Sequence, residues 1–186
     1  MIYTKDWCVL HIPRTSGTNF KVNALMKYNN SAIMPHSSPT ITDRLSQHNP
    51  ISSFDMGSRE VYAITRHPYT RALSLYTYAV NDPAFKVMFN NVSFRDFWEL
   101  DISAYCDWSL KTPQYDFIDD TVKTFKIEES LAELYSLTKV ISYKSGVNSS
   151  VSNINDYNNN NNRILVESIF NEDYHRFNYK KGIHNG

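Results

Sequence analysis

Two short apolar segments, residues 7–12 and 60–65, are each followed by a polar turn and then by an amphipathic helical pattern. Both segments are compact and partly β-branched, which favours buried parallel strands over helices of the same length. Thr18 or Asn19 is the expected N-cap of the first helix, and Pro68 stands in the first turn of the second. The repeated order of strand, loop and helix predicts an α/β fold in which both helices pack back onto the sheet.

The rest of the chain continues this alternation, and no linker divides its 186 residues, so we expect a single domain over 1–186. Apolar spacing and turn residues predict the remaining elements. In chain order these are a loop over 30–58 with a short helix near 42–45, a helix capped by Ser93 over 94–100, a strand over 121–127, a helix over 128–137, a mobile Asn-rich loop over 153–162 and a last helix over 163–177.

Formal charge is balanced, with 19 basic and 19 acidic residues, and this argues against nucleic acid as the main partner. The two cysteines, Cys8 and Cys106, give neither a disulfide framework nor a metal-ligand spacing, which indicates a reducing compartment and no metal site. The first apolar run is too short for a signal peptide or a membrane span. The protein is therefore expected to be cytoplasmic and to have no membrane partner.

The loop after the first strand has the chemistry of a phosphate cradle. A strand that ends at Ile12 and re-enters a helix presents backbone N–H groups over residues 15–19, next to the positive end of that helix. Gly17 lets the backbone approach a ligand, and Arg14 adds a permanent charge. Hydroxyl donors come from Thr15, Ser16 and Thr18. An ordinary turn with a helix cap is the alternative. The Gly-Lys-Ser/Thr pattern of nucleoside triphosphatases is missing, which disfavours triphosphate hydrolysis.

The second loop adds further anion-binding groups. Arg66 follows the second strand, so its guanidinium can reach the same edge of the sheet as Arg14. Arg71 and Ser74 share one face of the helix that follows, where they could clamp a phosphate through charge-assisted hydrogen bonds. Alternatively, Arg71 is a solvated helix residue and Arg66 pairs with a carboxylate. Two such loops suggest a ligand with two separated anionic groups, such as a nucleotide with phosphate at both ends of its ribose.

These two loops resemble a known family. Residues 11–20 (HIPRTSGTNF) look like the 5′-phosphosulfate loop of sulfotransferases, Pro-Lys-Thr-Gly-Gly-Thr-Ser. Residues 65–74 (TRHPYTRALS) match their 3′-phosphate motif, Arg-x-Pro-x-x-Arg-x-x-Ser, at every defined position. The similarity extends to the Pro113-Gln114 pair, to residues 126–131 and to residues 170–179. The branch that the chain resembles is that of the carbohydrate sulfotransferases related to heparan sulfate 2-O-sulfotransferase.

The resemblance implies a P-loop-NTPase-like three-layer fold, with a central, mainly parallel sheet flanked by helices. It also implies the use of 3′-phosphoadenosine 5′-phosphosulfate (PAPS) as sulfuryl donor, without a metal. The 5′ end would be held by Arg14, Thr15, Ser16, Gly17, Thr18 and Asn19, and the 3′-phosphate by Arg66 and Ser74. Arg14 would also stabilise the transferring group. It stands where most relatives have Lys, and protein-tyrosine sulfotransferases are similar in having Pro-Arg at this loop.

His48 is the candidate catalytic base, because a neutral imidazole that titrates near the operating pH suits this role. The segment 46–54 resembles the Gly-His-x-x-x-x-x-Phe segment that supplies the catalytic histidine in the 2-O-sulfotransferase branch. His36 and Asp43 are competing candidates, and a solvent-exposed loop histidine is the alternative interpretation of His48.

The sequence thus predicts a cytoplasmic sulfotransferase that moves a sulfuryl group from PAPS to a hydroxyl by in-line displacement, with the adenosine 3′,5′-bisphosphate PAP as product. The expected acceptor is a carbohydrate. Transfer to peptide tyrosine is the alternative with the same fold. A nucleotide-binding module without catalysis and a nucleotide kinase are the alternatives from other classes.

Overall fold

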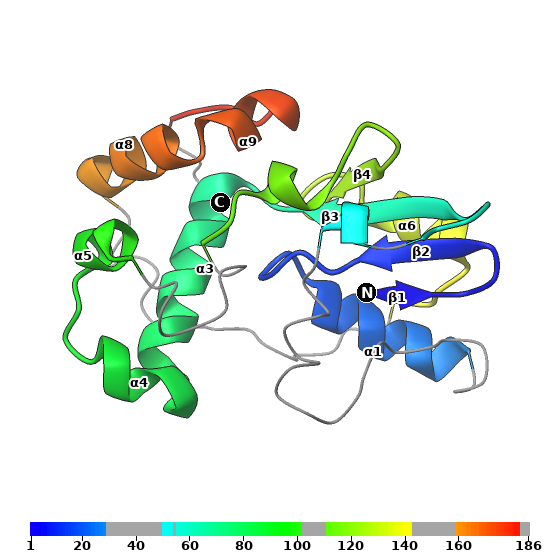
Figure 1. Cartoon of the computed structure of the whole chain (residues 1–186), viewed down its shortest axis with the longest axis horizontal. Coiled ribbons are helices and arrows are strands. Elements are labelled where there is room, and N and C mark those ends of the chain that lie inside the picture. Colours follow the sequence, from blue (N-terminus) through cyan, green and yellow to red (C-terminus); the bar gives the residue numbers. More distant parts are fainter. Residues whose placement is uncertain (29–49, 54, 102–110, 143–158, 183–186) are drawn as a thin grey trace. The chain divides into compact units, whose positions relative to one another are not determined.

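The chain forms an α/β structure whose sheet is mostly parallel (Figure 1). The computed structural model describes residues 1–28, 50–53, 55–101, 111–142 and 159–182. It divides into two compact units, each described here by itself. Unit 1 comprises Met1–Arg66 and Gln114–Val147, and unit 2 comprises His67–Pro113 and Asn148–Gly186. The expectation of a single domain stays a prediction.

Unit 1 contains the sheet, in the order β1-β2-β3-β4. Its strands are β1 (Ile2–Tyr3), β2 (Trp7–Leu10), β3 (Glu60–Thr65) and β4 (Lys123–Lys126). β3 pairs in parallel with both β2 and β4, whereas β1 pairs antiparallel with β2. The three predicted strands are confirmed, β3 over its full predicted length. β1 was not predicted, because two residues are too few to show an alternating pattern.

Two helices of unit 1, α1 (Gly17–Lys27) and α6 (Leu131–Thr138), share one core with the sheet. Val9, Ile64 and Phe125 alternate with residues of the other face along their strands, so they lie on a single face. Against them pack Phe20 of α1 and Leu134 of α6, both fully buried. The predicted packing of the first helix onto the sheet is therefore confirmed. Two 3₁₀ helices, η1 (Ile51–Ser53) and η3 (Gln114–Phe117), complete the described elements of this unit.

Cys8 lies in β2 with its thiol buried. Burial raises the pKa of this thiol to about 12, so the group stays protonated and is a poor nucleophile at neutral pH. Cys8 is therefore a packing residue of the sheet, in agreement with its place inside a predicted strand. Cys106 lies outside the described residues.

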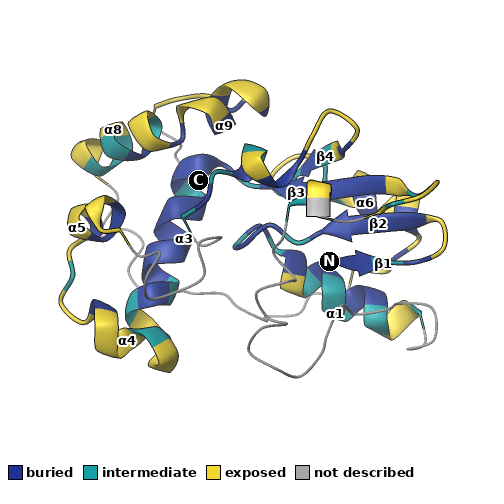
Figure 2. Ribbon diagram, in the orientation of Figure 1, coloured by how far each residue is buried: buried dark blue, intermediate teal, exposed yellow. Residues whose placement is uncertain are grey.

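Unit 2 is helical in its described part, and α3 (Pro68–Asn81) is its most buried helix, dark blue along most of its length in Figure 2. Around it are α4 (Pro83–Phe89), α5 (Phe94–Glu99), α8 (Asn160–Ile169) and α9 (Asn171–Arg176). The apolar stripe predicted for α3 is buried, but its members, such as Leu73 and Tyr76, pack in one cluster with Phe97 and Phe170. The stripe thus contributes to a core between helices of unit 2. The predicted packing of this helix onto the sheet stays a prediction.

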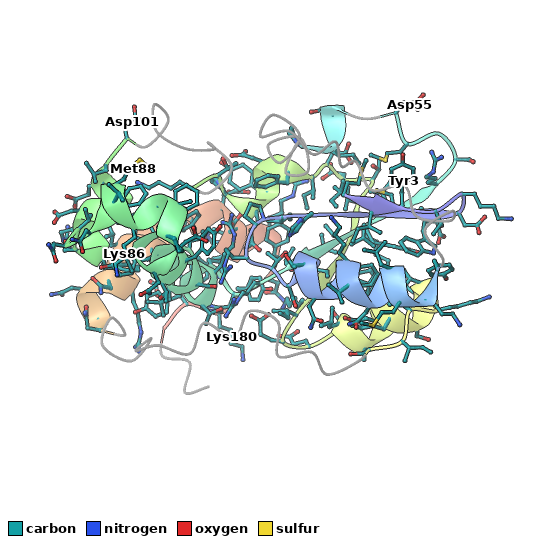
Figure 3. The ribbon with its side chains drawn as sticks, turned by 90° about the horizontal axis from the view of Figure 1, so that it is seen from below. Tyr3, Asp55, Lys86, Met88, Asp101 and Lys180 are labelled. Atoms are coloured by element: carbon teal, nitrogen blue, oxygen red, sulfur yellow. The ribbon has the colours of Figure 1, made fainter. Side chains whose placement is uncertain are left out.

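Helix starts explain where the sequence predictions hold and where they fail. Ser93 caps α5 as predicted, because its Oγ accepts the N–H of Asp96 at 3.1 Å. α4 was not predicted, since Pro83 suggests a break, yet Asp82 caps this helix and Pro83 occupies its first turn. Its outward side chains include Met88, which is labelled in Figure 3.

The Asn-rich segment and the last helix both differ from prediction. Asn159 is the N-cap of α8 and its Oδ1 accepts the N–H of Asn162 at 2.9 Å, so the end of the predicted mobile loop forms a helix start. Residues 153–158 lie outside the described part of the chain. The single helix predicted over 163–177 is divided into α8 and α9 at Phe170, where φ is −108° and ψ is 29°. No helix within the described residues has the length and apolar character needed to cross a membrane.

Candidate functional site

The loop between β2 and α1 has two residues in the left-handed backbone region, Arg14 with φ 65° and Ser16 with φ 72°. This conformation costs a residue other than glycine about 1–2 kcal/mol, so it persists only where the surrounding structure enforces it. Thr15 between them does not have a positive φ, and the ring of Pro13 fixes a negative one. The sign of φ thus alternates over residues 13–16. Alternation between right-handed and left-handed residues can turn successive N–H groups toward one concave side, where an anion can bind.

The loop runs directly into the first turn of α1. The first helical hydrogen bond joins the N–H of Phe20 to the carbonyl of Ser16 at 3.1 Å, so the N–H groups of residues 17–19 precede it. Ser16 is the N-cap, and its side chain makes no cap hydrogen bond. The predicted caps, Thr18 and Asn19, are therefore wrong by two and three positions. The helix therefore begins nearer to β2 than the sequence predicted. Ser16 has a left-handed backbone, whereas a residue whose side chain caps a helix usually has an extended one.

The side chains of the loop have different tasks. Thr15 is fully buried, and its hydroxyl donates to the carbonyl of Ile12 at 2.9 Å. This hydrogen bond stabilises the loop. The hydroxyl is used in it, so Thr15 would bind an anion through its backbone N–H. Thr18 is exposed. Asn19 is partly buried and its Oδ1 accepts from Nδ2 of Asn23 at 3.3 Å.

Gly17 is required by a neighbouring side chain of the loop. A Cβ at this position would lie 2.1 Å from Cδ2 of His11, far inside contact distance. The ring of His11 therefore occupies the space that a side chain at position 17 would need. The sequence suggested that Gly17 allows a ligand to approach the backbone, whereas the contact seen is with His11, which follows the last residue of β2.

Arg66 reaches this loop from the neighbouring strand. It follows Thr65, the last residue of β3, and its Nη1 donates to the carbonyl oxygen of Arg14 at 3.3 Å. The expected proximity of the two arginine positions is thus observed within unit 1. A guanidinium is charged at every physiological pH, so it places a permanent positive charge beside the alternating backbone of the loop.

Gln114 is a residue of this site to which the sequence assigned no role. Its side chain is fully buried, and its Oε1 accepts the backbone N–H of Arg66 at 2.8 Å. Its Nε2 donates to the backbone carbonyl of the same arginine, also at 2.8 Å. The only signal in the sequence was the Pro113-Gln114 pair in the family resemblance, which indicated a position and no function.

The remaining residues of the second motif belong to unit 2. Ser74 is buried on α3. Arg71 is 1% exposed, which makes it the largest fully buried side chain among the described residues, and its Nη2 donates to the carbonyl of Thr112 at 3.0 Å. Its interpretation as a solvated helix residue is therefore wrong. The ring of Phe170 lies 5.9 Å from its guanidinium carbon.

His67, next to Arg66 in the chain, has a structural environment. Its Nε2–H donates to the carbonyl of Lys180 at 3.1 Å, a residue labelled in Figure 3. The rings of Tyr174 and Tyr179 each lie 5.4 Å from the imidazole in edge-on arrangements. His67 thus anchors the C-terminal segment of unit 2.

The predicted base, His48, lies outside the described residues, as do the competing candidates His36 and Asp43. The assignment of the base stays a prediction from the sequence.

A pocket of about 460 Å³ opens in unit 1 at the other ends of the strands. Its lining includes Glu60 and Lys123, which are the first residues of β3 and β4. The hydroxyl of Tyr62 donates to the Glu60 carboxylate, and burial together with this contact raises the pKa of Tyr62 to about 12. Lys123 pairs with Glu133 at 2.9 Å. Glu60 and Lys123 thus each have a partner, and the pocket is separate from the loop between β2 and α1 because it lies at the amino ends of the parallel strands.

No family model, curated protein or solved structure matches this chain. The assignment to a family therefore depends on the two motifs and on the geometry of the loop that the first of them forms.

The strain at Ser16 leads to a prediction for stability. Replacing Ser16 with Gly should raise the free energy of unfolding by about 0.5–1 kcal/mol, because glycine adopts positive φ without steric cost and loses only part of that gain to unfolded-state entropy. Urea denaturation measures the change. Ser93→Gly is the matched control, since Ser93 is an N-cap with φ −68° and should lose a few tenths of a kcal/mol. A Ser16→Gly variant less stable than the wild type would contradict the assigned backbone.

Proposed function

We propose that this chain is a PAPS-dependent sulfotransferase that transfers a sulfuryl group to a hydroxyl, with a carbohydrate as the acceptor. One observation carries the proposal: the guanidinium of Arg66 donates to the carbonyl of Arg14 in a loop whose backbone alternates in hand before entering α1. Both residues belong to the motifs that resemble the two phosphate-binding motifs of sulfotransferases. The motif likeness and this contact together support an anionic ligand at the loop.

The fold proposed with this function is the P-loop-NTPase-like three-layer arrangement. Support comes from the parallel pairing of β2, β3 and β4 and from the loop that joins β2 to the N-terminus of α1. A loop in this place brings backbone N–H groups and the positive helix end to one point, as phosphate binding requires.

The residues of unit 1 fit a ligand that carries both a 5′-phosphosulfate and a 3′-phosphate. The backbone N–H groups of residues 14–19 would hold the 5′ end, and Arg66 would bind the 3′-phosphate through charge-assisted hydrogen bonds. Ser74, on α3 of unit 2, stays a prediction of the 3′-phosphate motif.

The bound donor would supply the sulfuryl group and leave as PAP. In the transfer, the acceptor oxygen forms a bond to sulfur while the bond from sulfur to the bridging phosphate oxygen breaks. Arg14 would stabilise the negative charge that develops on that bridging oxygen, a task for which a fixed positive charge suffices. His48 would accept the hydroxyl proton, so that the products are a sulfate ester, PAP and one proton. Placement and electrostatics would supply most of the catalysis, as in phosphoryl transfer.

Two measurements on the full chain test this function. Calorimetric titration should show PAP binding, and radiolabelled PAPS should transfer its sulfate to an oligosaccharide with open hydroxyls. A panel of acceptors that includes both sugars and tyrosine peptides decides the acceptor class. The peptides are included because the Pro13-Arg14 pair resembles the Pro-Arg of protein-tyrosine sulfotransferases. PAP binding without transfer to any hydroxyl would identify a nucleotide-binding module. Stabilisation by ATP in preference to PAPS would favour a nucleotide kinase and overturn the proposal.

The base has its own prediction. Replacing His48 with Gln should lower turnover about 10²- to 10⁴-fold and leave the affinity for PAP unchanged, because a general base acts on the acceptor proton and not on the nucleotide. Initial rates with labelled PAPS and calorimetry with PAP provide the two readouts. His175→Gln is the matched control, because His175 is exposed on α9 and should retain full activity. Full turnover in the His48 variant would move the role to His36 or Asp43.

A further inference from the structure

Arg66 lies just beyond the paired part of the sheet. The register between β2 and β3 ends where Leu10 pairs with Ala63, and that between β3 and β4 ends where Lys126 pairs with Thr65. The residue that carries the guanidinium therefore follows the last strand pair on both sides. A position at a strand end loses the ladder hydrogen bonds that fix φ and ψ in the middle of a sheet.

The side-chain amide of Gln114 supplies two backbone hydrogen bonds at this position. It accepts from the N–H and donates to the carbonyl of Arg66, both at 2.8 Å, which is the exchange that a neighbouring strand residue would make. The side chain is fully buried, so water does not compete for these bonds. Gln114 itself begins η3, whose Phe117 is also buried, and this gives the amide a rigid support.

We propose that Gln114 is a positioning residue that holds the backbone of Arg66 so that its guanidinium faces the anion-binding loop. This inference rests on the proposed function, because the ligand of Arg66 is taken to be the 3′-phosphate. With the backbone fixed, binding needs to order only the side chain of Arg66, which already donates to the carbonyl of Arg14. Without the amide, the nucleotide must also order the backbone at this residue.

The experiment compares two nucleotides and two variants on the full chain. Gln114→Met keeps the length of the side chain and removes both hydrogen bonds. Its dissociation constant for PAP should rise about tenfold, because ordering the backbone of one residue costs about 1–2 kcal/mol. Its dissociation constant for adenosine 5′-phosphate should stay within about twofold of the wild type, because that nucleotide has no 3′-phosphate for Arg66.

A double-mutant cycle with Arg66→Ala shows whether Gln114 acts through the arginine. In the Arg66→Ala background, adding Gln114→Met should cost no further affinity for PAP. Hydrogen exchange adds a local readout, in which the amide of Arg66 should exchange faster in Gln114→Met than in the wild type. Gln114→Glu is the second variant. It retains the acceptor but sets a carboxylate against the carbonyl of Arg66, so it should weaken PAP binding at least as much.

Four outcomes overturn the inference. The first is a folded Gln114→Met variant that binds PAP as tightly as the wild type, and the second is an equal loss of affinity for PAP and for adenosine 5′-phosphate. The third is a further loss of PAP affinity when Gln114→Met is added to Arg66→Ala. The fourth is the failure of both Gln114 variants to fold. The last would show that Gln114 holds the fold and does not serve to position the arginine. A wild-type chain that binds no PAP defeats the proposed function first, and this result is distinguishable from the other four because it appears before any substitution.

Discussion

Replacing Arg66 with Ala should raise the dissociation constant for PAP about 10- to 100-fold. A hydrogen bond to a charged group contributes about 1.5–3 kcal/mol, and each 1.4 kcal/mol corresponds to a factor of ten in affinity. Arg66 is partly exposed, and its contact with the carbonyl of Arg14 directs the guanidinium at the loop that would hold the nucleotide. Calorimetric titration with PAP at fixed ionic strength measures the effect.

The control for this result is Arg95→Ala, which removes the same charge from an exposed position on α5, where Arg95 pairs with Glu99. Its PAP affinity should equal that of the wild type, because Arg95 belongs to neither motif and its exposed charge is already paired with Glu99. The dissociation constant for adenosine 5′-phosphate should be the same in the Arg66→Ala variant and in the wild type. Equal PAP affinity in the Arg66→Ala variant and the wild type would contradict the assignment of the 3′-phosphate to this residue.

Replacing Arg71 with Ala should lower the free energy of unfolding by about 3–5 kcal/mol. The substitution opens a cavity where the largest fully buried described side chain stood, and it leaves the carbonyl of Thr112 without its donor. It also removes the guanidinium beside the ring of Phe170. Urea denaturation followed by circular dichroism measures the loss of stability.

The same control, Arg95→Ala, should cost less than about 1 kcal/mol, because an exposed pair contributes little. A similarly small loss in Arg71→Ala would show that the guanidinium is solvated after all. The two arginine variants should therefore have different effects. Arg71→Ala should mainly lower the stability of the protein without ligand, whereas Arg66→Ala should mainly lower the affinity for the nucleotide.

Local sequence was sufficient for the elements whose signal lies within a few residues. Five of the six residues of β3 are apolar or β-branched and predict a strand of the observed length, and Ser93 predicts the start of α5. β1 and α4 were not predicted, for different reasons. β1 is too short to carry a pattern, and a proline such as Pro83 fits a turn as well as the first turn of a helix.

The site was predictable to the extent that its residues directly follow predicted strands. The loop residues and Arg66 follow two strands, and parallel strands bring their carboxyl ends together. The positive φ values were not predictable, because they occur at Arg14 and Ser16 and not at the glycine between the loop and the helix. The amide of Gln114 is 48 positions from Arg66, and a side chain that bonds a distant backbone leaves no periodic trace in the sequence.

The bonds between Gln114 and Arg66 join the two points at which the chain leaves unit 1 and returns to it. The intervening residues therefore form an excursion whose ends are fastened to each other, and its length has no direct effect on the separation of those ends. During evolution, insertions and deletions in that excursion would be tolerated without moving the arginine at its base. Relatives of this protein would then differ most in the excursion beyond the motif residues 67–74, while the loop after β2 and Arg66 in unit 1 are retained.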